Sequence, residues 1–121
     1  MQVESLTAGR SDDEIDHRTL AVGYLRQYPS MTHSQLVQAE AHIAGLAAQH
    51  RLDLRKVFVE HLGTDPAAFD ALIKRVKRHR IPVVLVLTQV HLSAVGGDET
   101  KEERLRRETG AHVLAANRSH P

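Results

Sequence analysis

The apolar residues of this sequence follow two patterns, short continuous runs and longer stretches with helical spacing. Continuous apolar runs of about four to eight residues predict buried strands. The first run ends before Tyr28-Pro29-Ser30, where proline cannot extend a hydrogen-bonded ladder. The third run is apolar throughout, which predicts a strand near the centre of a sheet. The predicted strands span residues 20–25, 54–60, 82–87 and 112–115.

Stretches with apolar residues every three or four positions predict helices over 34–49 and 65–80, and opposite charges at the same spacing predict an exposed helix over 99–109. Ser34 is the predicted N-cap of the first helix, because its hydroxyl can accept a hydrogen bond from the first turn. Asp65-Pro66 predicts the start of the second helix, with an oxygen-bearing cap and a proline whose missing N–H costs nothing there. Gly110 ends the third helix, whose many charges predict an exposed position.

This alternation of strands and helices predicts an α/β fold: a small doubly wound, mostly parallel four-stranded sheet with helices on both faces. The 121 residues suffice for one domain, expected over 19–117, with a flexible acidic leader over 1–18 and a tail over 118–121. Such sheets bind ligands beyond the carboxyl ends of their strands. The segments to inspect are therefore 26–34, 60–66 and 88–97.

The composition excludes several classes of protein. Hydrophobic residues make up 41% and charged residues 26%, which suits a packed globular core. The chain has no cysteine, so disulfides, thiolate metal sites and cysteine nucleophiles are excluded. No apolar stretch approaches the roughly 18 residues of a membrane span, and we expect a cytoplasmic protein without membrane contact. The net charge of +1 favours no particular partner.

Several short segments follow one another in a recognisable order over residues 20–116. They are Val22-Gly23-Tyr24-Leu25-Arg26, Val57-Phe58-Val59-Glu60, Phe69-Asp70-Ala71-Leu72-Ile73, residues 83–87, and Thr109-Gly110-Ala111-His112-Val113. In this succession the chain resembles the catalytic domain of the resolvase/invertase family of serine recombinases. The resemblance implies a resolvase-like fold and self-association, so we expect a homo-oligomer. It also implies a chemistry in which a serine attacks a DNA phosphodiester and several arginines bind the phosphate.

The groups that perform this chemistry in the family are largely replaced here. Arg26 matches the arginine that precedes the nucleophile by two positions, but Tyr28 stands at the nucleophile's own position. Ser30 would occupy that position if the first loop were longer by two residues. Other family arginines, and an aspartate beside one of them, are also replaced; the residues at these positions are Pro66, Thr88, Gln89 and Leu92.

We therefore expect no catalytic residue, no cofactor and no metal, and a remnant pocket at the strand ends. Its members are Arg26, Tyr28, Ser30, Glu60, Thr88 and Gln89. Without its catalytic groups the resemblance implies a retained scaffold that works by binding.

Cations gather at the end of the second predicted helix, where they form a candidate interaction face. They are Lys74, Arg75, Lys77, Arg78, His79 and Arg80, with Arg51, Arg55 and Lys56 as further candidates for phosphate contacts. Cations at a helix C-terminus also complement its dipole, and a charged helix face is usually just solvated. Two Phe, two Tyr and no Trp leave little material for stacking on bases.

Nine histidines prompt a search for a metal site, since neutral imidazole is a common ligand. No two of them lie one helical turn apart. His61 and His91 both fall near strand ends, with Glu60 or Asp65 beside them, and are the candidates for a metal or acid–base site. Surface or hydrogen-bonded histidines are the expected alternative.

Three hypotheses for function follow. The leading one is a non-enzymatic, resolvase-like domain that binds another protein or itself in a regulatory or DNA-associated assembly. The second is a small-ligand or enzymatic site at the strand ends, built from Arg26, Tyr28, Glu60, His61 and His91. The third is sequence-independent DNA binding through the basic helix end.

Overall fold

A parallel sheet forms the middle layer of the computed structural model, which describes residues 18–92 and 99–117. Its strands are β2 (Thr19–Gln27), β3 (Leu52–His61), β4 (Val83–Thr88) and β5 (His112–Asn117). They lie in the order β3-β2-β4-β5, and every neighbouring pair is parallel. The predicted four-stranded α/β sheet is confirmed, and the apolar run at 82–87 lies in one of the two central strands.

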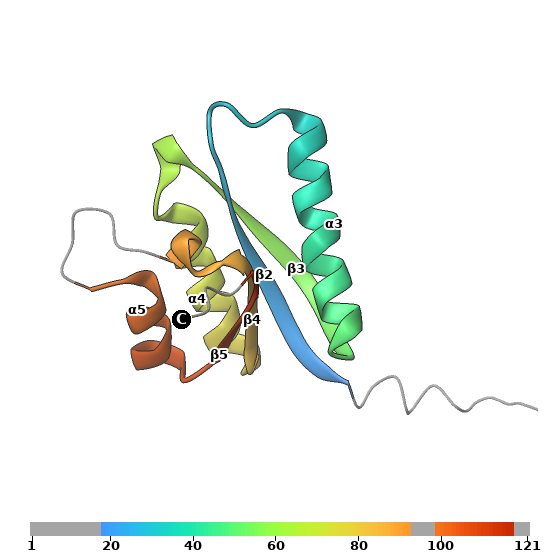
Figure 1. Cartoon of the computed structure of the whole chain (residues 1–121). Coiled ribbons are helices and arrows are strands. Elements are labelled where there is room, and N and C mark those ends of the chain that lie inside the picture. The colour runs from blue at the N-terminus through green and yellow to red at the C-terminus, as the bar shows by residue number, and fades with distance from the viewer. Residues whose placement is uncertain (1–17, 93–98, 118–121) are drawn as a thin grey trace, which may run out of the picture.

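Helices cover both faces of this sheet (Figure 1). Helix α3 (His33–Gln49) packs on one face, and α4 (Ala67–His79) and α5 (Lys101–Thr109) pack on the other. Short 3₁₀ turns, η1 (Leu62–Thr64) and η2 (Gln89–Leu92), follow β3 and β4. Helices on both faces bury the central strands from two sides, which explains why their sequences are continuously apolar. The doubly wound prediction is therefore confirmed.

Helix α3 lies close to the sheet at Gly23 in β2. A Cβ atom built on Gly23 would lie 2.8 Å from Cγ2 of Ile43, a fully buried residue of α3. Only glycine therefore allows the helix to lie this close to the strand without a shift of either. The opposite face of β2 presents Tyr24, whose ring meets that of Phe69 in α4 edge-on, with 5.3 Å between centroids.

The predicted start of the first helix is wrong by two residues. Thr32, and not Ser34, is the N-cap of α3: its hydroxyl accepts the N–H of Gln35, and the Gln35 side chain accepts the N–H of Thr32. This reciprocal capping box satisfies two otherwise unpaired backbone donors, whereas Ser34 already lies inside the helix.

The predicted start of the second helix is also wrong. Helix α4 begins at Ala67, Pro66 occupies the cap position, and the Asp65 side chain makes no cap hydrogen bond. The physical reason is that Asp65 pairs with two buried cations from other elements. Helix α5 begins at Lys101 after the N-cap Thr100, two residues later than predicted, and ends as predicted at Gly110, whose φ is +74°.

Parts of the predictions fall outside the described residues. They are the leader over 1–17, the glycines at 96 and 97, and the tail over 118–121. Among the described residues, no helix is both long enough and apolar enough to cross a membrane.

Candidate functional site

The carboxyl ends of β2 and β4 form the switch point of this sheet. The chain leaves β2 toward α3 on one face and leaves β4 toward α5 on the other (Figure 1). Adjacent parallel strands send their connections to opposite faces here, and ligands in α/β proteins bind beyond the strand ends at such a point. The residues just after β2 and β4 are therefore the first to inspect.

A buried carboxylate shared by two cations lies at this end of the sheet. The Arg26 guanidinium is 3.1 Å from Oδ2 of Asp65, and Nζ of Lys101 is 3.0 Å from Oδ1. The three side chains are 10%, 6% and 8% exposed. Within the described part of the chain neither Asp65 oxygen forms a well-aligned hydrogen bond, so charge attraction is the main contact there. Such a group is stable while all of its charges are present, because each charge offsets another's desolvation.

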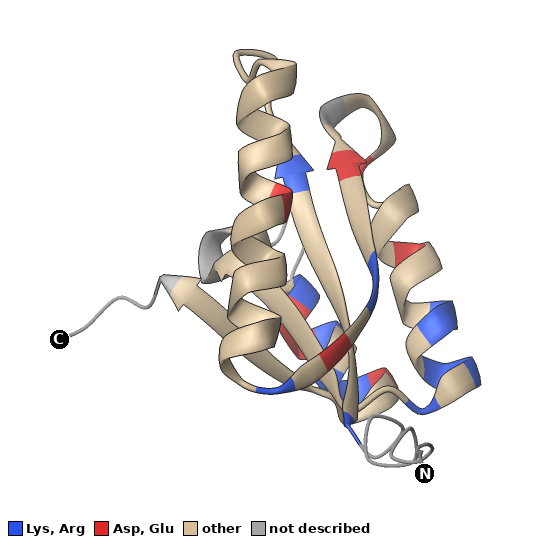
Figure 2. Ribbon diagram, turned by 90° about the vertical axis from the view of Figure 1, so that its right-hand side faces the viewer, with Lys and Arg blue, Asp and Glu red and all other residues tan. Residues whose placement is uncertain are grey.

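Glu60 forms a second buried polar cluster beside the first. Its backbone is the register partner of Arg26, so the basic end of β2 lies next to the acidic end of β3 (Figure 2). Glu60 is 1% exposed, and its carboxylate accepts hydrogen bonds from the Tyr24 hydroxyl at 3.1 Å and the Thr64 hydroxyl at 3.0 Å. It also accepts the N–H groups of Ala68 at 3.1 Å and Phe69 at 2.9 Å.

Glu60 therefore caps α4 from a neighbouring strand and places a negative charge at the positive end of the helix dipole. The same contacts act on Tyr24. Burial, together with the charge of Glu60 and the hydrogen bond to it, raises the pKa of the Tyr24 phenol far above its usual range. Tyr24 is thus a neutral hydrogen-bond donor in the folded protein.

His91, in η2, lies near Arg26 at this end of the sheet. Its side chain is 7% exposed, and its ring centroid is 6.0 Å from that of Tyr28 at an interplanar angle of 61°. Burial, and then the positive charge of Arg26, lowers the pKa of the His91 imidazole. Its Nδ1 atom is shut off from solvent and has no hydrogen-bond partner among the described residues. His91 is thus held neutral.

A groove of about 710 Å³ lies beside His91, between α3 and the carboxyl ends of β4 and β5. Most of its described lining is apolar, and no Asp, Glu, Lys or Arg belongs to that lining. The lining residues are Met31, Ala41, His42, Gly45, Leu46, Gln49, Leu87, Thr88, His91 and Ala116. A cleft of this volume and character suits a small, mostly apolar molecule.

The structure separates the six predicted pocket residues into groups. Arg26 and Glu60 belong to the two buried polar clusters, whereas Tyr28 contacts His91 and Thr88 lines the groove. Ser30 is exposed in a turn that the Met31 N–H closes onto the Tyr28 carbonyl at 2.9 Å. Gln89 begins η2, and its side chain is outside the described part.

The histidine hypothesis gains no geometric support. His61 is exposed at the end of β3, whereas His91 is buried. Within residues 18–92 and 99–117, no three His, Asp or Glu side chains gather in a way that would hold a metal ion.

Sequence reasoning missed the role of Lys101. Within a highly charged helix it looked exposed, yet its side chain is buried against Asp65. A signal for this was present, because Lys101 is the first residue of α5, where the positive end of the helix dipole disfavours a cation. A lysine at that position indicates a carboxylate partner elsewhere in the chain.

Comparison of the chain with protein-family models, curated proteins and solved structures finds no match. The resemblance to serine recombinases therefore rests on the segments quoted above and stays a prediction.

Proposed function

We propose that this chain is a non-catalytic, serine-recombinase-like domain that acts by binding, as a regulatory or interaction module. The observation that carries this proposal is the salt bridge between Arg26 and Asp65. Arg26 is the residue that matches the phosphate-binding arginine of the family, and a carboxylate already occupies its guanidinium. A phosphate would have to displace Asp65 and leave a buried carboxylate with one cation instead of two.

The remaining groups at this edge support the same proposal. Phosphodiester cleavage needs a nucleophile beside cations that stabilise the developing negative charge. Lys101, the other buried cation, is also held by Asp65, while Ser30 is exposed in its turn. Tyr28 packs against the neutral ring of His91, which supplies no positive charge.

A strand-cleavage assay with supercoiled plasmid tests this proposal directly. We expect the full chain to produce neither nicked plasmid nor a covalent protein–DNA adduct, with an active serine recombinase as the positive control. Adducts that form with the wild-type chain and disappear in Ser30→Ala would establish a serine nucleophile and refute the proposal. Adducts that disappear only in Tyr28→Phe would refute it through a tyrosine nucleophile.

The family resemblance favours a second copy of the chain as the partner. The cytoplasm is the proposed location, because its reducing conditions suit a chain without cysteine. Sedimentation velocity across a wide range of protein concentration tests self-association. An average mass that rises with concentration supports a homo-oligomer, whereas a constant monomer mass counts against it. Cell fractionation tests the location.

A small-ligand site in the groove is the second candidate function, and the buried His91 favours it. A neutral histidine at the wall of a mostly apolar cleft can orient one polar group of a ligand. Thermal unfolding with a panel of uncharged, apolar small molecules tests this, because a ligand of the folded state raises the midpoint temperature. The shift should vanish in His91→Leu; a panel without any shift would remove this candidate.

A further inference from the structure

The basic run at the end of α4 divides into two groups in the structure. Lys74, Arg75 and Arg78 line one shallow hollow together with Phe58 of β3. Lys77 does not line this hollow; its Nζ lies 3.7 Å from Oε1 of Glu108 in α5. The ion pair with α5 distinguishes Lys77 from the other cations, because helical spacing alone would place it beside Lys74, three positions before it.

The hollow has a volume of about 210 Å³, and its members come from an edge strand and a helix. Phe58, a buried residue, is part of its lining, and Nζ of Lys56 lies 5.1 Å from the centroid of the Phe58 ring. Four cations therefore surround one small depression: Lys56, Lys74, Arg75 and Arg78. We call this set the basic hollow.

The charges of the basic hollow are not neutralised from within the described structure. None of its four cations forms a salt bridge with a carboxylate among residues 18–92 and 99–117, and Nε of Arg75 is buried without a hydrogen-bond partner. Helix α5 provides the contrast, because each of its arginines meets a carboxylate. These arginines are Arg104, Arg106 and Arg107.

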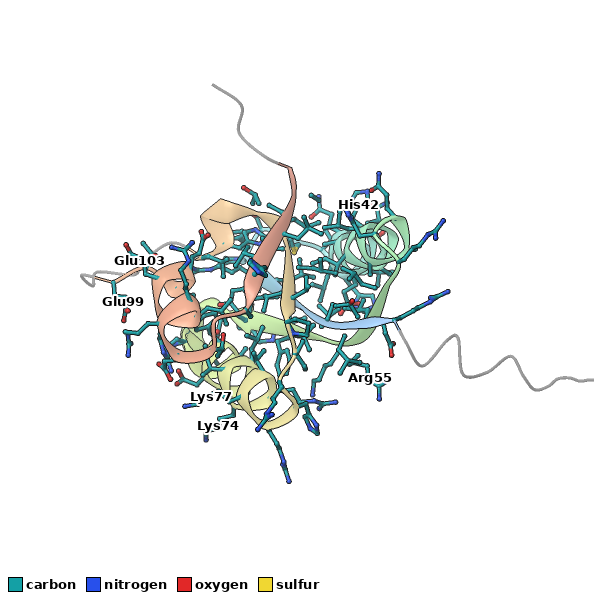
Figure 3. All side chains as sticks on the ribbon, turned by 90° about the horizontal axis from the view of Figure 1, so that it is seen from below. His42, Arg55, Lys74, Lys77, Glu99 and Glu103 are labelled. Atoms are coloured by element: carbon teal, nitrogen blue, oxygen red, sulfur yellow. The ribbon has the colours of Figure 1, made fainter. Side chains whose placement is uncertain are left out.

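The helix dipole does not account for this cluster. A C-terminal cation is favoured within the last turn, where Lys77, Arg78 and His79 lie. Lys74 and Arg75 precede that turn, and Lys56 belongs to β3. Lys and Arg colour much of the C-terminal half of α4 in Figure 2. Lys74 projects on the side of the molecule opposite His42 of α3 in Figure 3, so this face is separate from the groove.

We propose that the basic hollow binds the phosphate backbone of duplex DNA without reading its sequence. This inference rests on the proposed function, since it names the partner of a domain that acts by binding. Guanidinium groups match the geometry of phosphate oxygens, and an array of cations along one helical turn suits a repeating polyanion. Lys56 already covers the Phe58 ring, so the hollow offers no open apolar pocket for a peptide side chain.

The same residues argue against base recognition. Stacking on unpaired bases needs exposed aromatic rings, and both phenylalanines of the chain are buried, with Phe58 7% and Phe69 0% exposed. Contacts to the backbone of a duplex are then the mode that remains for this face. The affinity is expected to depend steeply on salt and weakly on sequence.

Fluorescence anisotropy of labelled random duplex DNA, titrated with the full chain, tests the proposal. At about 0.9 per phosphate contact, up to four contacts predict a slope of log affinity against log salt of about −3.6. Lys74→Gln with Arg78→Gln removes two exposed cations of the hollow and should weaken binding at low salt by about tenfold or more. The slope should become less negative by up to about 1.8, twice the contribution of one contact.

Arg106→Gln with Arg107→Gln is the matched control, because it removes the same charge from exposed residues of α5. Its affinity and salt slope should stay close to those of the wild type. Equal weakening in both double variants would mean that net charge alone governs binding and would overturn the proposal. Absence of binding at low salt would also overturn it, while leaving the result of the cleavage assay, and with it the non-catalytic proposal, unaffected.

A competition experiment separates DNA from an acidic protein partner. Poly-glutamate and unlabelled duplex, at equal total charge, compete with the labelled duplex. DNA should compete at least tenfold better. Equal competition would assign the hollow to acidic protein segments and contradict the DNA assignment.

Discussion

The Arg26 guanidinium lies 3.1 Å from the Asp65 carboxylate, and both side chains are buried at the carboxyl edge of the sheet. Lys101 meets the other oxygen of the same carboxylate at 3.0 Å. One aspartate thus joins the end of β2, the segment before α4 and the start of α5. The position that would bind phosphate in a recombinase-like site is part of the internal structure instead.

Asp65→Asn should destabilise the protein by about 3–5 kcal/mol, because two buried cations would lose the charge that compensates them. Chemical denaturation measures the free energy of unfolding. Asp65→Asn combined with Lys101→Met leaves one such cation instead of two, so part of the stability should return.

The control for this prediction is Asp53→Asn, which breaks an ion pair with Arg55 at the surface. Exposed pairs contribute at most about 1 kcal/mol, so this variant should unfold almost as the wild type does. If Asp65→Asn cost no more than Asp53→Asn, the buried network would not stabilise the fold.

The elements that the sequence predicted well are those whose signal is local. The apolar runs and helical spacing indicated every described strand and α-helix, since each pattern repeats several times within one element. The start of α4 was wrong because it depended on distant residues. Asp65-Pro66 has the local form of a cap, but Asp65 pairs with Arg26 and Lys101, and Glu60 supplies the capping oxygens.

The candidate site was predictable only in part for the same reason. Strand ends placed Arg26 and Glu60 in one predicted pocket, and in the structure the two are register partners. The sequence alone did not show that Asp65 neutralises Arg26 or that Glu60 caps α4. The different surroundings of Lys77, which pairs with Glu108 of α5, also depend on a distant element, so the sequence analysis grouped it with Lys74 and Arg78 into one run.

Gly23→Ala and Gly45→Ala should change stability in opposite directions. A Cβ at Gly23 would meet Ile43 at 2.8 Å, and overpacking of this kind costs about 1–3 kcal/mol. Gly45 lies within α3 with nothing within 4 Å of its added Cβ, so alanine there should stabilise by about 0.5–1 kcal/mol. Denaturant unfolding of both variants measures the difference. Equal effects would contradict the close contact between β2 and α3.

His91 should make the protein less stable in mild acid. Its lowered pKa means that the folded state resists a proton that the unfolded state accepts, so stability falls as pH drops below about 6.5. His91→Gln should flatten this dependence. Near pH 8 the difference in free energy of unfolding between wild type and His91→Gln reports packing alone. The change in that difference between pH 8 and lower pH reports the protonation of His91. If the difference between wild type and variant did not change with pH, His91 would have the same pKa in the folded and unfolded states, contrary to this prediction.

Tyr24→Phe should lower the free energy of unfolding by about 1.5–3 kcal/mol at neutral pH, because the phenol donates a hydrogen bond to the buried charge of Glu60. Tyr28→Phe is the matched control: its hydroxyl has no hydrogen bond among the described residues, so its removal should change stability by less than about 0.5 kcal/mol. The difference in free energy of unfolding between wild type and Tyr24→Phe should shrink above about pH 10. There the phenol of the unfolded chain loses its proton, while the folded one, with its raised pKa, keeps it. Urea unfolding at neutral and alkaline pH measures both effects, and an advantage that grew with pH would contradict the buried, neutral phenol.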